Sequence, residues 1–201
     1  MNQENHKGLF WYRVKLITLI LVFISPFVGG WLALYVFEWR PSSGNYGELI
    51  VPVRKIEWPV LETIDGEQLR QGFGRKWVLV LFAGDACVGQ CRNNIHYMRQ
   101  IRTLLGRNSG RLQNVLIVGA PVDDALRDFL REYPRFRVIG DNRDPALYRQ
   151  FELEGLGSVG SSARLYLVDP DQNLMMHFPA DNDEYKVLDD LKKLLKLSQI
   201  G

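Results

Sequence analysis

The chain has 201 residues, ordinary globular fractions of apolar and charged residues, and a net charge of +2. This length suggests one domain plus an additional segment. The small charge and the dispersed arginines argue against nucleic acid as a partner. Both cysteines of the chain, Cys87 and Cys91, fall within one five-residue stretch, and this clustering is the most informative feature of the composition.

The first candidate element is an uncharged apolar stretch from Leu16 to Phe37. About 20 apolar residues in a helix span a bilayer core, and spanning helices tolerate residues such as Pro26. The stretch exceeds the roughly 7–15 residues of a signal-peptide core, and no small-x-small cleavage site follows it. We therefore expect an uncleaved transmembrane helix over residues 16–37, rather than a signal peptide or a buried core helix.

The charges beside this stretch predict its orientation. Lys7, Arg13 and Lys15 precede it, whereas Arg40 is the basic residue that follows closely. The positive-inside rule then makes residues 1–15 a cytoplasmic tail. We expect a single-pass protein of the cytoplasmic (inner) membrane whose C-terminal domain lies in the periplasm of a bacterium.

Residues 38–47 contain the turn-rich segment Pro41–Asn45 and predict a linker, which leaves residues 48–201 as a folded domain. Apolar periodicity and continuous apolar runs divide this domain into strands and helices. Strands are expected over residues 48–53, 58–64, 77–82, 114–119, 136–139, 164–168 and 174–178, and helices over residues 88–105, 122–130, 144–153 and 184–197.

This order of elements predicts an α/β fold. Strands joined through helices pair in parallel, so the early strands should form a parallel core. The turn residues Asp169–Asn173 join the last two strands into an antiparallel hairpin. A mixed sheet with helices on both faces results.

The cysteines lie where the first buried strand leads into the first long helix. A helix N-terminus carries partial positive charge and free N–H groups, which favour a thiolate over a thiol. Arg92 adds positive charge and Asp85 works against it. A separation of four residues on a helix places two Cα atoms about 6 Å apart, a distance that a disulfide can bridge.

Three interpretations of the pair remain open. Cys87 and Cys91 form a reactive or metal-binding pair, a structural disulfide, or two inert buried thiols. Closing so short a loop contributes only about 2 kcal/mol of stability, and a domain with this many apolar residues does not need such a bridge. Inert thiols are less natural in an oxidising compartment. The pattern favours the first interpretation.

Together, the strand, the cysteine pair at a helix start and the segment Leu165–Asp171 resemble the Sco/SenC family. The resemblance covers roughly Glu48 to Leu197, extends to the N-terminal anchor, and matches the family's CxxxC motif at Cys87 and Cys91. It implies a thioredoxin-like fold, copper bound by the two cysteines, and a role in assembling the copper centre of cytochrome c oxidase.

The sequence departs from the family pattern at two places. Val88 stands where a proline follows the first cysteine of the family. Residues Ser158–Ser162 contain no histidine, although the family places a copper-ligating histidine there. Thioredoxins carry a cis-proline near the same point, and this stretch of the chain contains no proline. The resemblance therefore implies fold and location more firmly than copper transfer.

The histidines and helix arginines supply the other candidate ligands. His6 belongs to the predicted tail, and His96 should point away from Cys91 on the helix. His177 follows two methionines, and thioether, imidazole and thiolate ligands suit Cu(I), although packing is the simpler role. The arginines of the first helix predict a solvated face, with the docking of an acidic partner as the alternative: Arg92, Arg99 and Arg102.

Three functions follow from these patterns. The first is a thiol reductant or copper-delivery factor for cytochrome c oxidase, in which Cys87 and Cys91 react with a partner disulfide or bind copper. The second is a general thiol-disulfide oxidoreductase of the envelope. The third is a non-catalytic oxidase assembly protein. The expected partners are the lipid bilayer and either oxidase subunits or other envelope thiol proteins.

Overall fold

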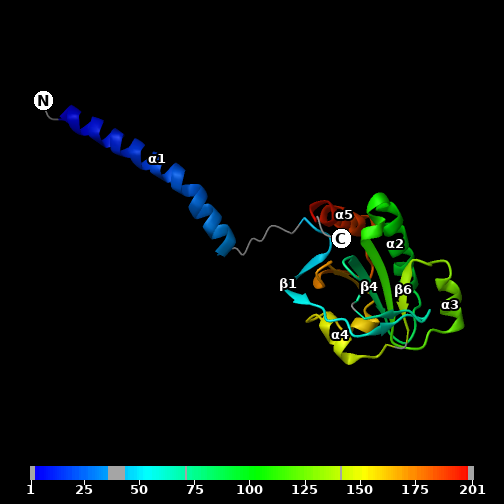
Figure 1. Ribbon diagram of the computed structural model, residues 1–201. Helices are drawn as coiled ribbons and strands as arrows, with labels where there is room; N and C mark the ends of the chain where they lie inside the picture. The colour runs from blue at the N-terminus through cyan, green and yellow to red at the C-terminus, as the bar shows by residue number, and fades with distance from the viewer. Residues whose placement is uncertain (1–2, 36–43, 71, 141, 199–201) are drawn as a thin grey trace. The chain divides into compact units, whose positions relative to one another are not determined.

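The computed structural model describes residues 3–35, 44–70, 72–140 and 142–198. The chain divides into two compact units, Met1–Gly44 and Asn45–Gly201. The first unit is built on one helix, and the second unit contains every strand of the described residues (Figure 1).

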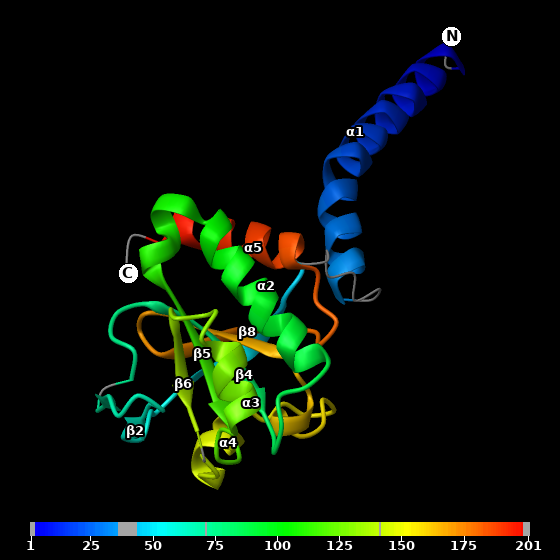
Figure 2. The same cartoon turned by 90° about the vertical axis from the view of Figure 1, so that its right-hand side faces the viewer.

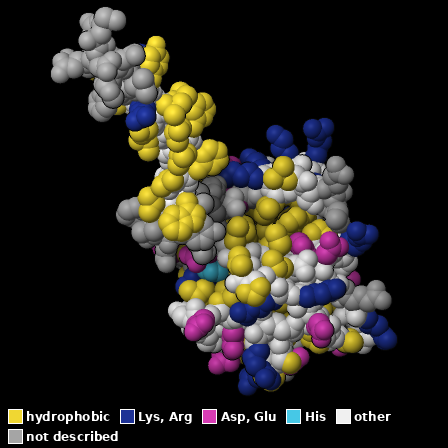
Figure 3. All heavy atoms as spheres, turned by 90° about the vertical axis from the view of Figure 1, so that its left-hand side faces the viewer, with side chains coloured by type: hydrophobic (Ala, Val, Ile, Leu, Met, Phe, Trp, Pro, Cys, Tyr) yellow, Lys and Arg dark blue, Asp and Glu magenta, His cyan; other side chains and the backbone are white. Residues whose placement is uncertain are grey.

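The first unit contains helix α1, Gln3–Tyr35. Its stretch Trp11–Leu32 is long and apolar enough to cross a membrane, and none of it is buried within the protein (Figure 3). The hydroxyl groups of Thr18 and Ser25 donate hydrogen bonds to backbone carbonyls one turn earlier, so these polar groups are satisfied within the helix. The helix therefore fits a lipid bilayer. The last two residues of the predicted span 16–37 and residues 38–43 of the predicted linker lie outside the described residues.

The second unit is organised around a six-stranded sheet with the order β1-β8-β7-β4-β5-β6. Strands β4, β5 and β6 are parallel, whereas β7, β8 and β1 are joined by antiparallel pairs. Its strands are β1 Glu48–Lys55, β4 Trp77–Ala83, β5 Leu112–Val118, β6 Phe136–Ile139, β7 Leu165–Val168 and β8 Asn173–Phe178, and a small separate sheet pairs β2 Leu61–Glu62 with β3 Gln68–Leu69.

Helices cover both faces of the sheet (Figures 1 and 2). On one face, α2, α3 and α5 contribute buried side chains to a single core, and on the other face α4 does so. The helices are α2 Gln90–Leu104, α3 Asp124–Leu130, α4 Pro145–Phe151 and α5 Glu184–Leu197, with short 3-10 helices η1 Gly106–Arg111 and η2 Val159–Ser161.

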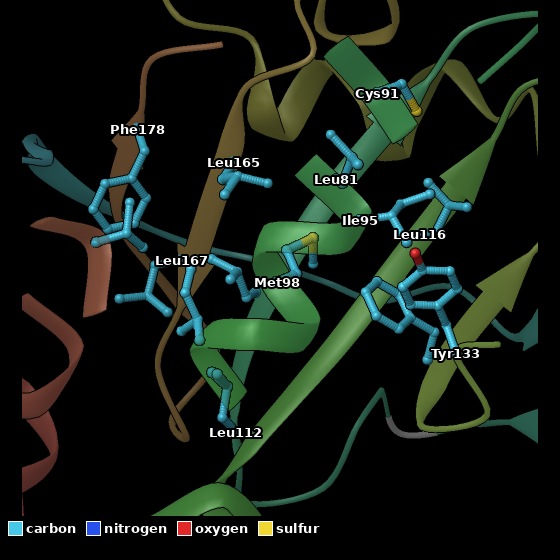
Figure 4. Close-up of a cluster of buried hydrophobic side chains, with 14 of the residues drawn as sticks. Leu81, Cys91, Ile95, Met98, Leu112, Leu116, Tyr133, Leu165, Leu167 and Phe178 are labelled. Atoms are coloured by element: carbon cyan, nitrogen blue, oxygen red, sulfur yellow. The ribbon is translucent and has the colours of Figure 1, made fainter. Parts of the chain in front are cut away.

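Burial of both faces of the central strands explains this layering. Every residue of β4 and β5 is buried, as expected for parallel strands with helices on both sides. Leu81 of β4 and Leu116 of β5 face α2, whose Ile95 and Met98 pack against them (Figure 4). Phe82 points to the opposite face, where aromatic rings from α4 and β7 surround it. The core beneath α2, which contains Ala83 and Cys91, holds the start of α2 against the end of β4.

The predicted α/β architecture, a mixed sheet flanked by helices, is confirmed. The bounds of β6 and α5 agree with the predictions, but α2 begins at Gln90 rather than at residue 88. The strand predicted over residues 58–64 is reduced to β2, which pairs only with β3.

His177 of β8 is buried in this sheet and lies beside Tyr166, its partner in β7. Its Nε2 lies 3.3 Å from a carboxylate oxygen of Glu48 in β1. Burial lowers the pKa of His177 below its ordinary value, Glu48 opposes this shift, and Arg164 adds to it. The folded protein therefore holds this imidazole neutral more readily than the unfolded chain does.

The pH dependence of stability should report this burial. Because the pKa of His177 is lowered in the folded state, its neutral form contributes to the free energy of unfolding. This contribution is complete above the unfolded-state pKa of about 6.5 and is lost as pH falls through the folded-state pKa. We expect the full-length parent to lose more stability between pH 7 and pH 5 than its His177→Gln variant, measured by urea unfolding in detergent. His96→Gln, which changes an exposed histidine, is the control. Parallel pH profiles for the parent and His177→Gln would contradict this account.

Candidate thiol site

The site begins where β4 leaves the sheet. A six-residue loop, Gly84–Gly89, follows Ala83 and leads into α2 at Gln90. Gly89 caps the helix with φ +53°, a left-handed conformation that glycine adopts without steric cost. Cys87 therefore lies in the loop and Cys91 in the first helical turn, so the pair brackets the N-terminus of α2.

The structure joins the two cysteines in a disulfide, with their Cα atoms 5.2 Å apart. Cys87 is 3% exposed and Cys91 is 6% exposed, and both belong to the core beneath α2. Between them, Val88 is 65% exposed and forms the outer surface of the loop. The two sulfurs are thus bonded as a pair, and both cysteines are almost fully removed from solvent.

The charges near the pair favour an anionic sulfur. The first turn of α2 contains no acidic residue, so the helix N-terminus keeps its partial positive charge. Arg92 donates from Nε to the carbonyl oxygen of Cys87 at 3.1 Å, and its guanidinium lies 5.0 Å from the centre of the Phe129 ring. Asp85 is exposed and lies 4.0 Å from Arg143, so solvent screens its opposing charge.

Arg92 also corrects a sequence expectation. The arginines of α2 were expected to form a solvated face, but Arg92 is half-buried and links the cysteine loop to α3 through Phe129. Farther along the helix, Arg99 lies over the ring of Tyr133, and Arg102 is half-buried as well. These side chains pack on their neighbours because α3 and the segment before β6 lie alongside α2.

Asn94 organises the site and was missed from the sequence. It is fully buried on α2, one turn after Cys91. Its Nδ2 donates to the carbonyl oxygens of Ala163 at 2.6 Å and Ala180 at 3.1 Å. Its Oδ1 accepts from Gln90 and Asn182 at 3.0 and 3.1 Å, so the whole amide is satisfied. An asparagine within the apolar stripe of the predicted helix was the available signal.

The segment before β7 lies against the cysteine loop. Ala163 has φ +47°, and its carbonyl is the group that Asn94 holds. Just upstream, the Gly160 carbonyl would lie 3.2 Å from a Cβ added to Gly84, so two glycines allow this segment to contact the cysteine loop. Among the described residues, the cis peptide bond joins Val51 to Pro52 in β1, far from this segment in the chain.

The histidines do not join the cysteines. His177 faces the core on the opposite side of the sheet from Cys87 and Cys91, together with Tyr166. His96 is exposed, and its Nε2 lies 2.7 Å from the amide of Gln100. The side chain of His6 lies outside the described residues. Within the parts of the chain that the structure describes, no group of three or more His, Cys, Asp or Glu side chains is arranged to hold a metal ion.

These features define a thioredoxin-like domain with a CxxxC pair at its first long helix, preceded by an apolar helix that fits a membrane. The chain belongs to the family described as transmembrane-like, thioredoxin-like, C-terminal domain, whose model matches residues 77–198. A search of the curated proteins found no match to this chain.

Solved structures share the fold. Yeast Sco1 with copper bound is 18% identical, with a TM-score of 0.57, 78% of this chain covered and 96% of that one. BsSco, described as a Sco-family cytochrome c oxidase assembly protein with a disulfide switch, is 14% identical, with a TM-score of 0.56 and coverage of 73% and 96%. A putative protein disulfide isomerase from Bacteroides thetaiotaomicron is 16% identical, with a TM-score of 0.54 and coverage of 76% and 94%. The resemblance to Sco/SenC proteins is thereby confirmed for the fold.

Removing the Asn94 amide should destabilise the site. Asn94→Ala removes the donor to two part-buried carbonyls and one acceptor of the buried Asn182 amide, and each unsatisfied buried group costs about 1–3 kcal/mol. We expect the free energy of unfolding to fall by about 2–4 kcal/mol, measured by urea unfolding of the full-length, disulfide-bonded protein in detergent. Asn93→Ala, at an exposed position one residue earlier, is the matched control. Equal losses in the two variants would contradict a structural role for the Asn94 amide.

Proposed function

We propose that this protein is a membrane-anchored thiol protein of the periplasm that serves cytochrome c oxidase assembly as a thiol reductant or copper-delivery factor. The observation that carries the proposal is the placement of Cys87 and Cys91, at bonding distance, on either side of the α2 N-terminus. The names of the fold relatives support it, since they include an oxidase assembly protein and a copper-bound Sco1.

The same proposal assigns the parts of the chain. Residues 1–15 form a cytoplasmic tail, residues 16–37 the transmembrane helix, residues 38–47 a linker, and residues 48–201 the periplasmic domain. The basic residues before the span and the apolar character of Trp11–Leu32 support this arrangement in the inner membrane.

As a reductant, the protein acts through its two thiols. The Cys87 thiolate attacks one sulfur of a partner disulfide, and the other partner sulfur leaves as a thiolate. The Cys91 thiolate then attacks the Cys87 sulfur of the mixed disulfide, which releases the second partner sulfur and forms the Cys87–Cys91 bond. Two electrons pass to the partner, and another envelope thiol protein must supply two electrons to restore the dithiol. The α2 N-terminus and Arg92 stabilise the thiolates during these steps.

As a delivery factor, the protein carries copper as cargo. The donor set of the site is two cysteine sulfurs, which suit Cu(I) in a two-coordinate arrangement. Of the described histidine side chains, His96 is exposed and His177 faces the opposite side of the sheet, so neither supplies an imidazole that would strengthen Cu(II) binding. Cys87 and Cys91 would hold the ion only when reduced, which couples copper loading to the redox state of the pair.

A general thiol-disulfide oxidoreductase of the envelope is the second candidate. The fold it shares with a putative protein disulfide isomerase favours this function. Such an enzyme needs an accessible sulfur and a broad substrate groove normally lined by a cis-proline, whereas Cys87 and Cys91 are buried here and residues 158–164 contain no proline. These features favour a dedicated partner, and the rate of insulin reduction separates the two functions.

Copper binding should depend on both sulfurs. We expect the reduced full-length protein to take up one Cu(I) per chain in competition with a chromophoric chelator, and we expect Cys87→Ser and Cys91→Ser each to abolish that uptake. Val88→Ser changes the exposed residue between the cysteines and should leave it intact. If the parent and Cys87→Ser bound equal amounts of copper, the metal-delivery role would be lost.

Oxidase assembly should also depend on the pair. In cells that lack the chromosomal copy, we expect the parent to restore cytochrome c oxidase activity and the double variant Cys87→Ser, Cys91→Ser to fail, with both proteins present at equal levels in the membrane. Because the pair is buried and bonded in the core, the unfolding temperature of the double variant is measured alongside. Normal oxidase activity with the double variant would favour the non-catalytic assembly protein.

A further inference from the structure

A cleft lies away from the cysteines, between the second half of α2 and the segment that leads into β6. Its volume is about 410 Å³. Asn114 of β5 forms part of its lining and pairs in register with Leu79, near the start of β4, whereas the cysteine loop follows the opposite end of that strand. The cleft and the thiol site are therefore at different ends of the parallel strands.

Three arginines give this cleft its charge: Arg99, Arg102 and Arg135. Within the described residues, none of the three forms an ion pair with a carboxylate. Glu132 also lines the cleft, but it is exposed. Arg102 donates to the backbone carbonyl of Arg135 at 3.3 Å, and the Arg99 guanidinium lies 5.4 Å from the centre of the Tyr133 ring. Burial lowers the pKa of Arg102, and the nearby charge of Arg135 lowers it further, so like charges are held together here.

Two buried polar atoms in the lining have no hydrogen-bond partner within the part of the chain that the structure describes. One is the Nε donor of Arg102, and the other is the Oδ1 acceptor of Asn114. Asn114 is only 1% exposed, and its Nδ2 already donates to the carbonyl of Met98 at 2.9 Å. An unsatisfied buried donor or acceptor costs about 1–3 kcal/mol, so native structures rarely keep one without a reason. The cleft thus lacks both an acceptor for Arg102 and a donor for Asn114.

We propose that this cleft binds a phosphate ester that also carries a hydroxyl group. The phosphate oxygens would accept from the guanidinium groups, which match phosphate geometry better than any other side chain. The hydroxyl group would donate to Asn114 Oδ1. The volume lies within the range of small-molecule sites, and the rings of Tyr133 and Phe136 give it apolar walls.

A purely solvated arginine face does not explain these observations. Arg102 is half-buried, its Nε is sealed from solvent, and the Asn114 amide is in the core beneath α2. Solvation would leave each guanidinium extended into water with its donors hydrated. The proposal is independent of thiol chemistry, because none of the cleft residues contacts Cys87 or Cys91 through any described hydrogen bond.

The test is calorimetric titration of the full-length protein in phosphatidylcholine nanodiscs with sn-glycerol 3-phosphate. We expect one site per chain, and we expect Arg99→Ala and Arg135→Ala each to raise Kd about tenfold, as the loss of one charge-assisted hydrogen bond predicts. Both arginines are exposed, so the variants should fold, and their unfolding temperatures check this. Arg107→Ala removes one exposed arginine outside the cleft and should leave Kd unchanged.

The source of the phosphate is distinguished in a second arm. Nanodiscs that contain phosphatidylglycerol offer the same groups on a lipid, so a raised Kd for sn-glycerol 3-phosphate there supports a lipid headgroup as the ligand. An unchanged Kd supports a soluble ester. Three results would overturn the proposal. They are the absence of saturable binding, an equal increase in Kd for Arg107→Ala and Arg135→Ala, and a Kd for inorganic sulfate, which has no hydroxyl group, as low as that for the ester.

Discussion

The structure depends on one packing constraint, the burial of β4 and β5 on both faces. Because every residue of these strands is enclosed, α2 must lie directly on the sheet, and Ile95, Met98 and Ile101 provide the surface that does so. The chain then has only a short loop in which to leave β4 and start the helix. The cysteines occupy that loop and the first turn, so their separation and their electropositive surroundings follow from how the core is enclosed.

Backbone contacts and one amide extend this constraint to the rest of the site. Glycines at residues 84 and 160 let two loops approach closely, and Asn94 holds the carbonyl of Ala163 from the helix side. Between the cysteines Val88 is exposed, whereas both cysteines are buried and bonded to each other, so the loop presents an enclosed disulfide.

Local patterns predicted most of this fold, because hydrophobic periodicity and capping residues act over a few neighbours. The Asp144 cap, the β7–β8 hairpin and the parallel central strands all follow from such patterns. The predicted start of α2 was two residues too early, because Gly89 has a non-helical backbone that the hydrophobic periodicity did not predict. Asn94 was missed, and Arg102 was expected on a solvated face, because their partners lie in distant segments and their roles arise only once the helices pack.

Helix α2 links the two ends of the domain electrostatically. Its N-terminus favours anionic sulfur at Cys87 and Cys91, and its last turn places Arg102 where a positive charge offsets the negative end of the helix dipole. That favourable interaction helps the helix tolerate the repulsion between Arg102 and Arg135, which otherwise opposes folding. An anion bound between these arginines would remove the repulsion and would stabilise the C-terminal half of α2. Since Ile95 and Met98 anchor the same helix to the sheet between the two ends, occupancy of the cleft would rigidify the element that carries Cys91, without any contact between the two sites.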